Sequence, residues 1–315
     1  MLHLSAQERY YFYNQIVDMR KGCYALVSLG FLTLSAPSAF ATCSGQLEGV
    51  LRATGQEYDP FHPADLYTRH AVSVRNIGSA KCEFIVVFHR EPAEGRLGQL
   101  LSYRIEELSG EALLTASFPP IASRYLATGE VEQGRTATIT YQIVVPRGQF
   151  APPNLYADVI RLSLHTRDKV GHVNPVAVDT QSLQIERTVL ASVRLNVAGG
   201  GLTTTVNFGE LAQGKERSVL LNARANHSYK LALRSKNENS LKLDPTIPGQ
   251  DWSVPYTLRV NGEAVALRPA APIVRSRPLS SGEETHSLAF KIDDAMNKRA
   301  GLYRDTITIE VSVNP

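Results

Sequence analysis

The nine residues Tyr156–Leu164 (YADVIRLSL) recur near the end of the chain as Tyr303–Val311 (YRDTITIEV). The Tyr, the Asp and three aliphatic positions match, and all of them fall on alternate residues. Alternate side chains of a β-strand point to one face, so this pattern predicts a strand with one buried and one partly solvated face. The repeat therefore predicts two copies of the same strand in one chain.

Two further matches lie upstream of each copy. Phe84–Phe88 (FIVVF) matches Tyr229–Leu233 (YKLAL), and Tyr141–Ile143 (YQI) matches Phe290–Ile292 (FKI). All three matches keep the same order at nearly the same spacing, so we infer one domain that was duplicated, with small insertions in its loops. The length of 315 residues suits about two domains, and the apolar fraction of 43% can support two ordinary cores.

Each half of the chain contains short alternating segments separated by turn residues such as Pro152-Pro153 and Gly199-Gly200-Gly201. This spacing predicts an all-β protein of two immunoglobulin-like antiparallel β-sandwiches. We expect the first sandwich over residues 42–178 and the second over 185–315, with the passage between them inside 170–186. The expected strands are Ala71–Val74, Cys82–Phe88, Ser102–Glu106, Thr136–Val145 and Tyr156–Leu164, then Val189–Val197, Ser218–Asn222, Tyr229–Arg234, Tyr256–Val260, His286–Ile292 and Tyr303–Val313.

A secretory signal peptide is expected over residues 19–41. Met19-Arg20-Lys21 supplies a basic start, Gly22–Leu34 is apolar, and small residues occupy positions 39 and 41. The apolar part is shorter than the roughly 20 residues that a membrane-spanning helix needs. We expect translation to start at Met19, which would leave residues 1–18 as an upstream segment outside the natural protein.

Cleavage after Ala41 would remove Cys23 and leave Cys43 and Cys82 as a pair in an oxidising compartment. We therefore expect a disulfide between them, worth roughly 4 kcal/mol in the chain-entropy account of a loop of about 40 residues. The alternative is a pair of free, buried thiols.

One segment has part of the pattern of a phosphate-binding loop. Gly209, Gly214 and Lys215 have the required spacing, but Glu216 stands where Ser or Thr should hold magnesium. The next residues alternate as in a strand, so no helix N-terminus would face a phosphate. The segment is interpreted as a turn between strands.

No other motif indicates catalysis, a cofactor or a metal. The histidines are scattered without ligand spacing, and no Gly-x-Ser-x-Gly elbow occurs. Asp158 and Asp305 recur like a carboxylate pair, but equivalent positions in two domains should lie far apart, so we interpret both, with Tyr156 and Tyr303, as structural. A formal net charge of +3 without a basic stripe argues against a nucleic-acid partner. We expect no enzyme activity.

Several segments resemble spore coat protein U domains, a family that includes secreted subunits of archaic, Csu-type chaperone–usher pili. The resemblance covers nearly all of the chain after residue 41. In the second half it is carried by Ala300–Ile309, Asn207–Leu211, Asn226–Ser235 and Val254–Leu258, and in the first half by Cys43, Cys82 and Asn154–Asp158.

The resemblance implies an immunoglobulin-like sandwich that lacks one strand, at least in the second domain, where the chain ends directly after the expected closing strand. In this family a periplasmic chaperone fills the gap first, and the N-terminal extension of the next pilin replaces it. The implied partners are therefore a pilin donor strand, a periplasmic chaperone and an outer-membrane usher. The protein would pass through the periplasm to the cell surface.

A chain beginning at Thr42 would have no donor extension before Cys43, so we expect it to stand at the tip of a fibre as an adhesin. The candidate contacts with a surface or glycan are Phe118, Pro119, Pro120, Ile121 and Tyr125, apolar residues of a Pro-rich loop. Two alternatives stay open: a periplasmic assembly chaperone of two immunoglobulin-like domains, and a secreted carbohydrate-binding sandwich or enzyme.

Overall fold

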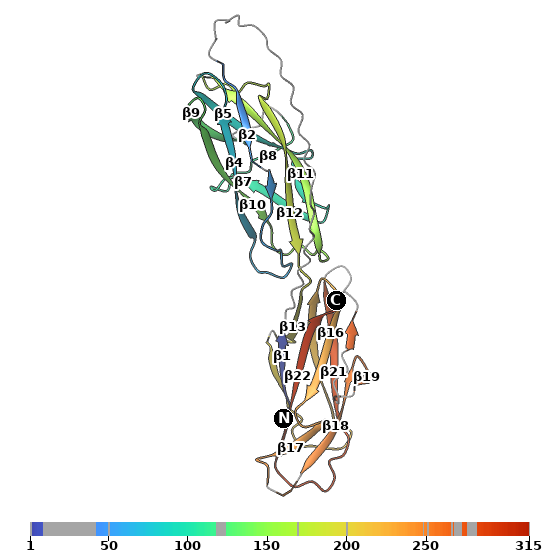
Figure 1. The fold of residues 1–315 in the computed structure, drawn as a ribbon. Helices are drawn as coiled ribbons and strands as arrows, with labels where there is room; N and C mark the ends of the chain where they lie inside the picture. Colours follow the sequence, from blue (N-terminus) through green and yellow to red (C-terminus); the bar gives the residue numbers. More distant parts are fainter. Residues whose placement is uncertain are drawn as a thin grey trace, which may run out of the picture.

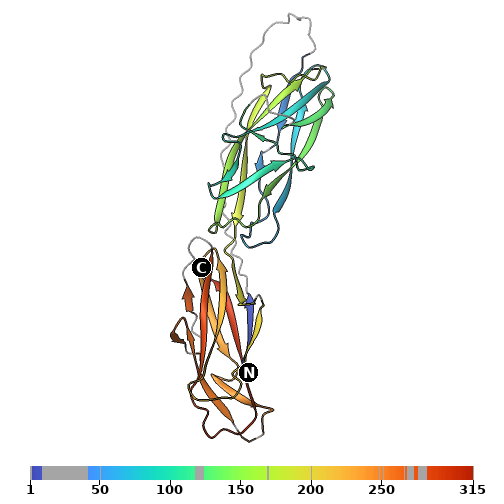
Figure 2. The same cartoon turned by 180° about the vertical axis from the view of Figure 1, so that it is seen from behind.

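The protein is an all-β chain, as predicted. Its computed structural model describes residues 2–8, 42–49, 51–117, 124–168, 170–199, 201–247, 249–250, 252–265, 267, 273–275 and 282–314. Within these ranges there are 22 strands and no helix, and accordingly no helix that could cross a membrane. The strands form two sandwiches that lie end to end, as Figure 1 and the reverse view in Figure 2 show. The expected signal peptide, 19–41, lies outside the described residues.

The first sandwich packs a sheet of five strands against one of six. The strand order of the five-stranded sheet is β2 (Gly45–Glu48), β4 (Leu66–Asn76), β10 (Thr136–Val145), β7 (Leu101–Glu106) and β6 (Gly95–Leu97). The order of the six-stranded sheet is β3 (Arg52–Ala53), β12 (Asp179–Val189), β11 (Asn154–Arg167), β5 (Cys82–His89) and β8 (Leu114–Thr115), with β9 (Leu126–Val131) also on β5.

The second sandwich has the same plan. One sheet contains β13 (Val193–Val197), β15 (Glu216–Ala225), β21 (Glu283–Ile292), β18 (Ser253–Val260) and β19 (Glu263–Val265). The other contains β20 (Ile273–Arg275), β16 (Tyr229–Ser235), β22 (Leu302–Val313), β1 (Leu2–Glu8) and β14 (Thr203–Val206). β17 (Ser240–Asp244) pairs with both β18 and β22 and joins the two sheets.

The repeated segments occupy the same places in the two sandwiches. Tyr156–Leu164 lies in β11 and Tyr303–Val311 in β22, and each strand pairs with the strand of the second match, β5 and β16. The strands of the third match, β10 and β21, pair with β4 and β15 in the opposite sheets. The matching apolar side chains are buried in two separate cores, one for each sandwich.

The first sandwich extends further than the sequence predicted. Residues 179–186, expected mainly in the passage between domains, belong to β12, and the expected strand 189–197 is divided between β12 and β13. Leu183, Ile185 and Val189 lie in the first core. The sequence concealed this strand because Gln181 and Arg187 occupy two of its alternate positions, which makes the segment look like a polar linker. The passage between the sandwiches is 190–192.

Candidate functional site

The two sandwiches differ in the strand that follows the repeated one. In the first sandwich β11 pairs antiparallel with β12, the next strand of the chain, from Asn154↔Val189 to Leu164↔Asp179. In the second, the neighbour of β22 is β1, from the other end of the sequence. It runs parallel to β22 from Leu2↔Asp305 to Glu8↔Val311. Figure 1 shows this strand in blue beside the red β22. The place of a closing strand is therefore filled by a distant segment.

β1 is bonded on both of its edges. Opposite β22 it pairs antiparallel with β14, from Leu2↔Val206 to Ser5↔Thr203. Among the described strands β14 has no other partner. Withdrawing β1 would leave β14 unpaired and expose the amides and carbonyls of one edge of β22, which is the kind of edge that recruits another strand. We call this position, between β22 and β14, the acceptor groove.

The strand that lines the acceptor groove also carries part of the second core. Ile307, Ile309 and Val311 of β22 are fully buried and alternate with half-buried residues. On the far side of β22 lies β16, so the groove side is the one that depends on a strand from elsewhere. An empty groove would leave this edge of the sheet without its backbone pairing.

Asp305 anchors the start of β22 inside the second sandwich. The residue is only 2% exposed, and its Oδ2 accepts hydrogen bonds from the Tyr256 hydroxyl (2.6 Å) and the Ser235 hydroxyl (2.5 Å). Oδ1 accepts the Asn237 amide hydrogen at 2.9 Å. Burial, followed by the nearby carboxylate, raises the pKa of Tyr256, so this phenol stays neutral and donates. Tyr303 nearby donates to the Arg299 carbonyl at 2.8 Å.

The matching residues of the first sandwich make matching contacts. Asp158 accepts from the Tyr103 hydroxyl (2.7 Å) and from Nε of Arg90 (2.6 Å). Tyr156 donates to the carbonyl of Pro152, four residues earlier, at 2.8 Å. Asp158 and Asp305 therefore lie in separate sandwiches, where each serves its own strand and neither faces the other.

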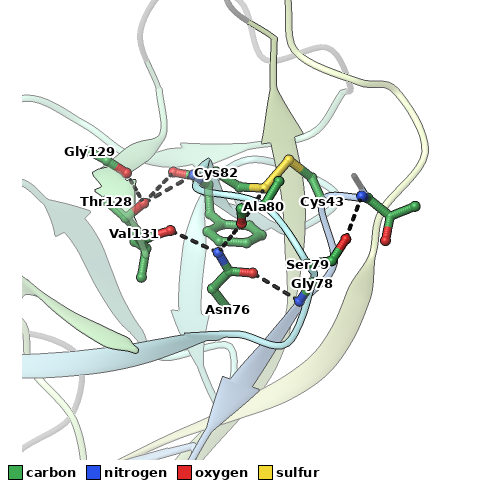
Figure 3. Close-up of a disulfide and its surroundings, with 11 residues drawn as sticks. Cys43, Asn76, Gly78, Ser79, Ala80, Cys82, Thr128, Gly129 and Val131 are labelled. Carbon is green, nitrogen blue, oxygen red and sulfur yellow. Dashed lines mark hydrogen bonds between the residues drawn. A yellow bond between two sulfur atoms is a disulfide. The ribbon is translucent and has the colours of Figure 1, made fainter. Parts of the chain in front are cut away.

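The expected disulfide joins Cys43 to Cys82, with Cα atoms 5.7 Å apart. Figure 3 shows the bridge beside Asn76, whose Nδ2 donates to the carbonyls of Ala80 and Val131, both at 2.8 Å. Thr42 is also fixed, because its amide donates to the Ser79 hydroxyl at 3.0 Å. The start of the first sandwich is thus bound to the loop that precedes β5.

Replacing Cys43 and Cys82 together by Ser should lower the free energy of unfolding of the first sandwich by about 4 kcal/mol, because the bridge links two residues that are 39 positions apart in the sequence. Urea unfolding would measure this through hydrogen exchange in β4 and β5. Trp252, the single tryptophan, reports on the second sandwich and should keep its transition. Equal losses in both sandwiches would contradict a local role for the bridge.

The proposed surface contacts fall in two groups. Phe118, Pro119, Pro120 and Ile121 lie outside the described residues. Tyr125 is half-buried, its hydroxyl accepts a hydrogen bond from Arg167, and the guanidinium of Arg167 lies 5.3 Å from its ring centroid. Tyr125 is therefore part of a packed cluster with Arg167, whose own charge is paired with Glu83 at 3.1 Å.

Three exposed apolar residues that the sequence did not single out lie at the end of the first sandwich remote from the second. Val170 and Val176 lie between β11 and β12 and are 81% and 69% exposed, and Ile77, between β4 and β5, is 54% exposed. The end of β11 and the beginning of β5 meet at Arg167↔Glu83, so both loops belong to one end of the sandwich. Strand pairing could have grouped them, but sequence order alone separates them by about ninety residues.

The described residues contain no group of His, Cys, Asp and Glu arranged to hold a metal ion. Two buried histidines instead share one serine: Nε2 of His89 and Nε2 of His165 lie 2.9 and 2.8 Å from the Ser163 hydroxyl. Nδ1 of His165 faces the Asn174 carbonyl at 2.9 Å and must donate to it, so the neutral ring accepts from Ser163 through Nε2. This chain of bonds secures the loop after β11.

The first sandwich should lose stability in mild acid. Burial, and then the positive charge of Arg187, lowers the pKa of His70 to about 4, and burial also lowers the pKa of His89 and His165. Below pH 6.5 these histidines are protonated in the unfolded chain but stay neutral in the folded chain. The unfolded state therefore binds more protons, and the free energy of unfolding falls as the pH decreases. Between pH 7.5 and 5.0 we expect a loss of about 2 kcal/mol from His70. Hydrogen exchange in β4 and β10 would measure it. His70→Gln should show a smaller loss, and equal losses would contradict this assignment.

These features define an all-β protein of two immunoglobulin-like sandwiches, the second of which is completed by a strand from a distant part of the chain. No protein-family model and no curated protein match the chain.

Among solved structures, the chain is similar to the CsuC–CsuE chaperone–tip adhesion subunit pre-assembly complex of the archaic chaperone–usher Csu pili of Acinetobacter baumannii. The identity is 13% over 86% of this chain and 99% of that one, with a TM-score of 0.49. It is also similar to the CupB6 tip adhesin of Pseudomonas aeruginosa, with 11% identity, coverage of 87% and 99%, and a TM-score of 0.36. A chaperone–tip adhesin complex of CFA/I fimbriae matches at 11% identity, coverage of 80% and 78%, and a TM-score of 0.34.

Proposed function

We propose that the protein is a secreted tip subunit of a chaperone–usher pilus, whose acceptor groove receives a strand from a neighbouring pilin and whose first sandwich adheres to a surface. The observation that carries this proposal is the exchange of β12 for β1: one sandwich has a closing strand from its own sequence, and its duplicate is closed by a segment that is remote in sequence. A groove that holds β1 through backbone pairing on both edges can hold another strand in the same way.

The proposal assigns different tasks to the two sandwiches. The first contains β12 and the disulfide, so it needs no strand from a partner. The second offers one acceptor groove, and a periplasmic chaperone would occupy it before the pilin does. With a signal peptide cleaved after Ala41, the chain would begin at Thr42, which is bonded to Ser79 of the first sandwich and therefore cannot serve as a donor strand. A subunit that accepts a strand and donates none stands at the end of a fibre.

Adhesion would come from the end of the first sandwich that is remote from the groove. Exposed Ile77, Val170 and Val176 gather there, and an apolar area removed from water contributes about 25 cal/mol per Å². Phe118, Pro119, Pro120, Ile121 and Tyr125 remain contact candidates, with Tyr125 acting through the cluster it forms with Arg167. The protein would act by binding and not by catalysis.

A periplasmic chaperone or a free carbohydrate-binding protein would require two sandwiches that are each complete without a partner. The position of the protein on the fibre and its effect on adhesion distinguish a tip subunit from these two alternatives. Gold-labelled antibody against the first sandwich should mark the ends of fibres on cells that carry the chain together with an usher, a chaperone and a pilin. Label along the shaft, or only in the periplasm, would overturn the tip assignment.

The contact assignment has its own test. Val170→Ser with Val176→Ser should reduce adhesion of the cells to an apolar surface several-fold while fibres and label stay unchanged. Val159→Ser, an exposed position on the outer face of β11, is the matched control. Unchanged adhesion in the double variant would remove these residues from the contact.

A further inference from the structure

The passage between the two sandwiches is short. β12 ends at Val189 and β13 begins at Val193, which leaves three residues. The Leu190 amide donates to the Tyr58 carbonyl of the first sandwich at 3.2 Å, and the Ser192 carbonyl accepts the amide hydrogen of Asn226, in the second sandwich, at 3.2 Å. The passage is therefore bonded to a sandwich at each of its ends.

One buried amide connects all three parts. Asn226 is 0% exposed, and its Oδ1 accepts the Ser192 amide hydrogen at 2.8 Å. Its Nδ2 donates one hydrogen to the Leu190 carbonyl at 2.8 Å and the other to the Ala151 carbonyl, in the first sandwich, at 3.0 Å. Both hydrogens and the oxygen of this side chain are thus used, two of them on the passage and one on the first sandwich.

A second loop of the first sandwich contacts the other sandwich independently. Asp59 Oδ2 lies 2.7 Å from Nη2 of Arg194, and the Arg224 guanidinium lies 5.1 Å from the ring centroid of Phe61. Tyr58 connects this loop to the one that contains Ala151, because its hydroxyl donates to the Pro146 carbonyl at 3.0 Å. The two loops that contact the second sandwich are therefore hydrogen-bonded to each other within the first sandwich.

The backbone of Gly282 lies close to the ring of Phe150, the neighbour of Ala151 in the sequence. Gly282 of the second sandwich has a φ of +69°, and a Cβ added there would lie 2.5 Å from Cε2 of Phe150. A residue with a side chain would have to displace the Phe150 ring. Glycine at this position therefore serves the fit between the sandwiches as well as the local turn.

The first sandwich has a comparable asparagine that lacks this task. Asn76 is the last residue of β4, and Asn226 directly follows β15, the strand in the equivalent place. Asn76 is equally buried, but its bonds go to Gly78, Ala80 and Val131 of its own sandwich. A buried amide at this strand end thus secures a local loop in one sandwich and the joint in the other.

We propose that the two sandwiches form one rigid rod. The passage 190–192 and the loops 58–61 and 150–151 form the joint between them, and Asn226 is the clamp that hydrogen-bonds the passage to both sandwiches. Relative motion is the default for two domains that share a small polar interface, so rigidity is a specific consequence of these contacts. A force applied to the first sandwich would be transmitted to the acceptor groove without bending of the chain between the sandwiches. This inference goes beyond the proposed function and requires only a folded chain whose second sandwich is closed by residues 2–8.

The test is ¹⁵N relaxation of the chain from Thr42 onward, with a peptide of residues 2–8 in the groove. The rod predicts one rotational diffusion tensor for both sandwiches. Asn226→Ala should separate them, with a shorter correlation time for each sandwich. Asn76→Ala, the matched control, should keep one tensor. Two tensors in the unaltered chain, or one tensor in folded Asn226→Ala, would overturn the proposal.

A second variant covers the case in which Asn226→Ala unfolds the second sandwich. Asp59→Ala with Phe61→Ala removes the contacts of the other loop without altering the second sandwich. It should broaden the distribution of interdomain orientations and shorten both correlation times. If this double variant is folded and tumbles as the unaltered chain does, residues 58–61 do not hold the second sandwich, and that part of the proposal is refuted.

Discussion

The chain from Thr42 onward, with its acceptor groove empty, should have a second sandwich that unfolds far more easily than the same sandwich with a strand bound. Both edges that pair with β1 would be open, and β14 would have no partner among the described strands. A peptide of residues 2–8, added at about 100 times its dissociation constant, should stabilise the second sandwich by about 2.7 kcal/mol through mass action. Trp252 fluorescence during urea unfolding measures this directly, because the only tryptophan lies against the second core.

The control for this result uses backbone chemistry alone. A peptide of the same sequence, N-methylated at the alternate residues whose amides face β22, keeps its side chains and cannot donate hydrogen bonds to β22. It should give less than a tenth of the stabilisation at the same concentration. The first sandwich, closed by β12, should be indifferent to both peptides. A Trp252 transition that does not respond to the unmodified peptide would contradict the acceptor groove.

Asp305→Ala should cost the second sandwich about 4 kcal/mol. It would leave the Tyr256 and Ser235 hydroxyls and the Asn237 amide without their acceptor in a buried place, and each lost bond of this kind costs about 1–3 kcal/mol. Asp305→Asn retains one acceptor oxygen and should cost less. Urea unfolding monitored through Trp252 gives both values.

The repeat supplies a matched control for this substitution. Asp158→Ala removes the acceptor of Tyr103 and Arg90 in the first sandwich and should destabilise that sandwich, with the Trp252 transition unchanged. If Asp305→Ala changed the stability of the second sandwich by less than 1 kcal/mol, Asp305 would not be the anchor of β22.

Much of the fold could be predicted from alternation and repetition. The strands around Phe84, Tyr141, Tyr229 and Phe290 were predicted because apolar residues alternate there over several positions, and burial on one face of a sheet requires that pattern. The disulfide followed from the cysteine count after removal of Cys23. Both inferences depend on local or countable features of the sequence.

The elements that the sequence concealed depend on tertiary contacts. Residues 179–186 of β12 were predicted in the passage between the domains. Arg187 interrupts the apolar alternation of this strand, yet it lies on the buried side, where it donates to the Ala53 carbonyl at 3.1 Å. The clamp was invisible because the chemistry of Asn226 depends on Ala151, which is 75 residues away. The acceptor groove was inferred only through a family resemblance, since a missing neighbour leaves no local pattern.

Hydrogen exchange in β14 tests the central claim most directly. Thr203–Val206 pairs with nothing but β1 among the described strands, so the alternate amides of this strand that face β1 report on the acceptor groove alone. In the chain from Thr42 onward they should exchange at the rate of an open loop, and the peptide of residues 2–8 should protect them, while β11 and β12 stay protected throughout. Protection of Thr203–Val206 in the chain without the peptide would show that the second sandwich closes without a borrowed strand, and would contradict the account.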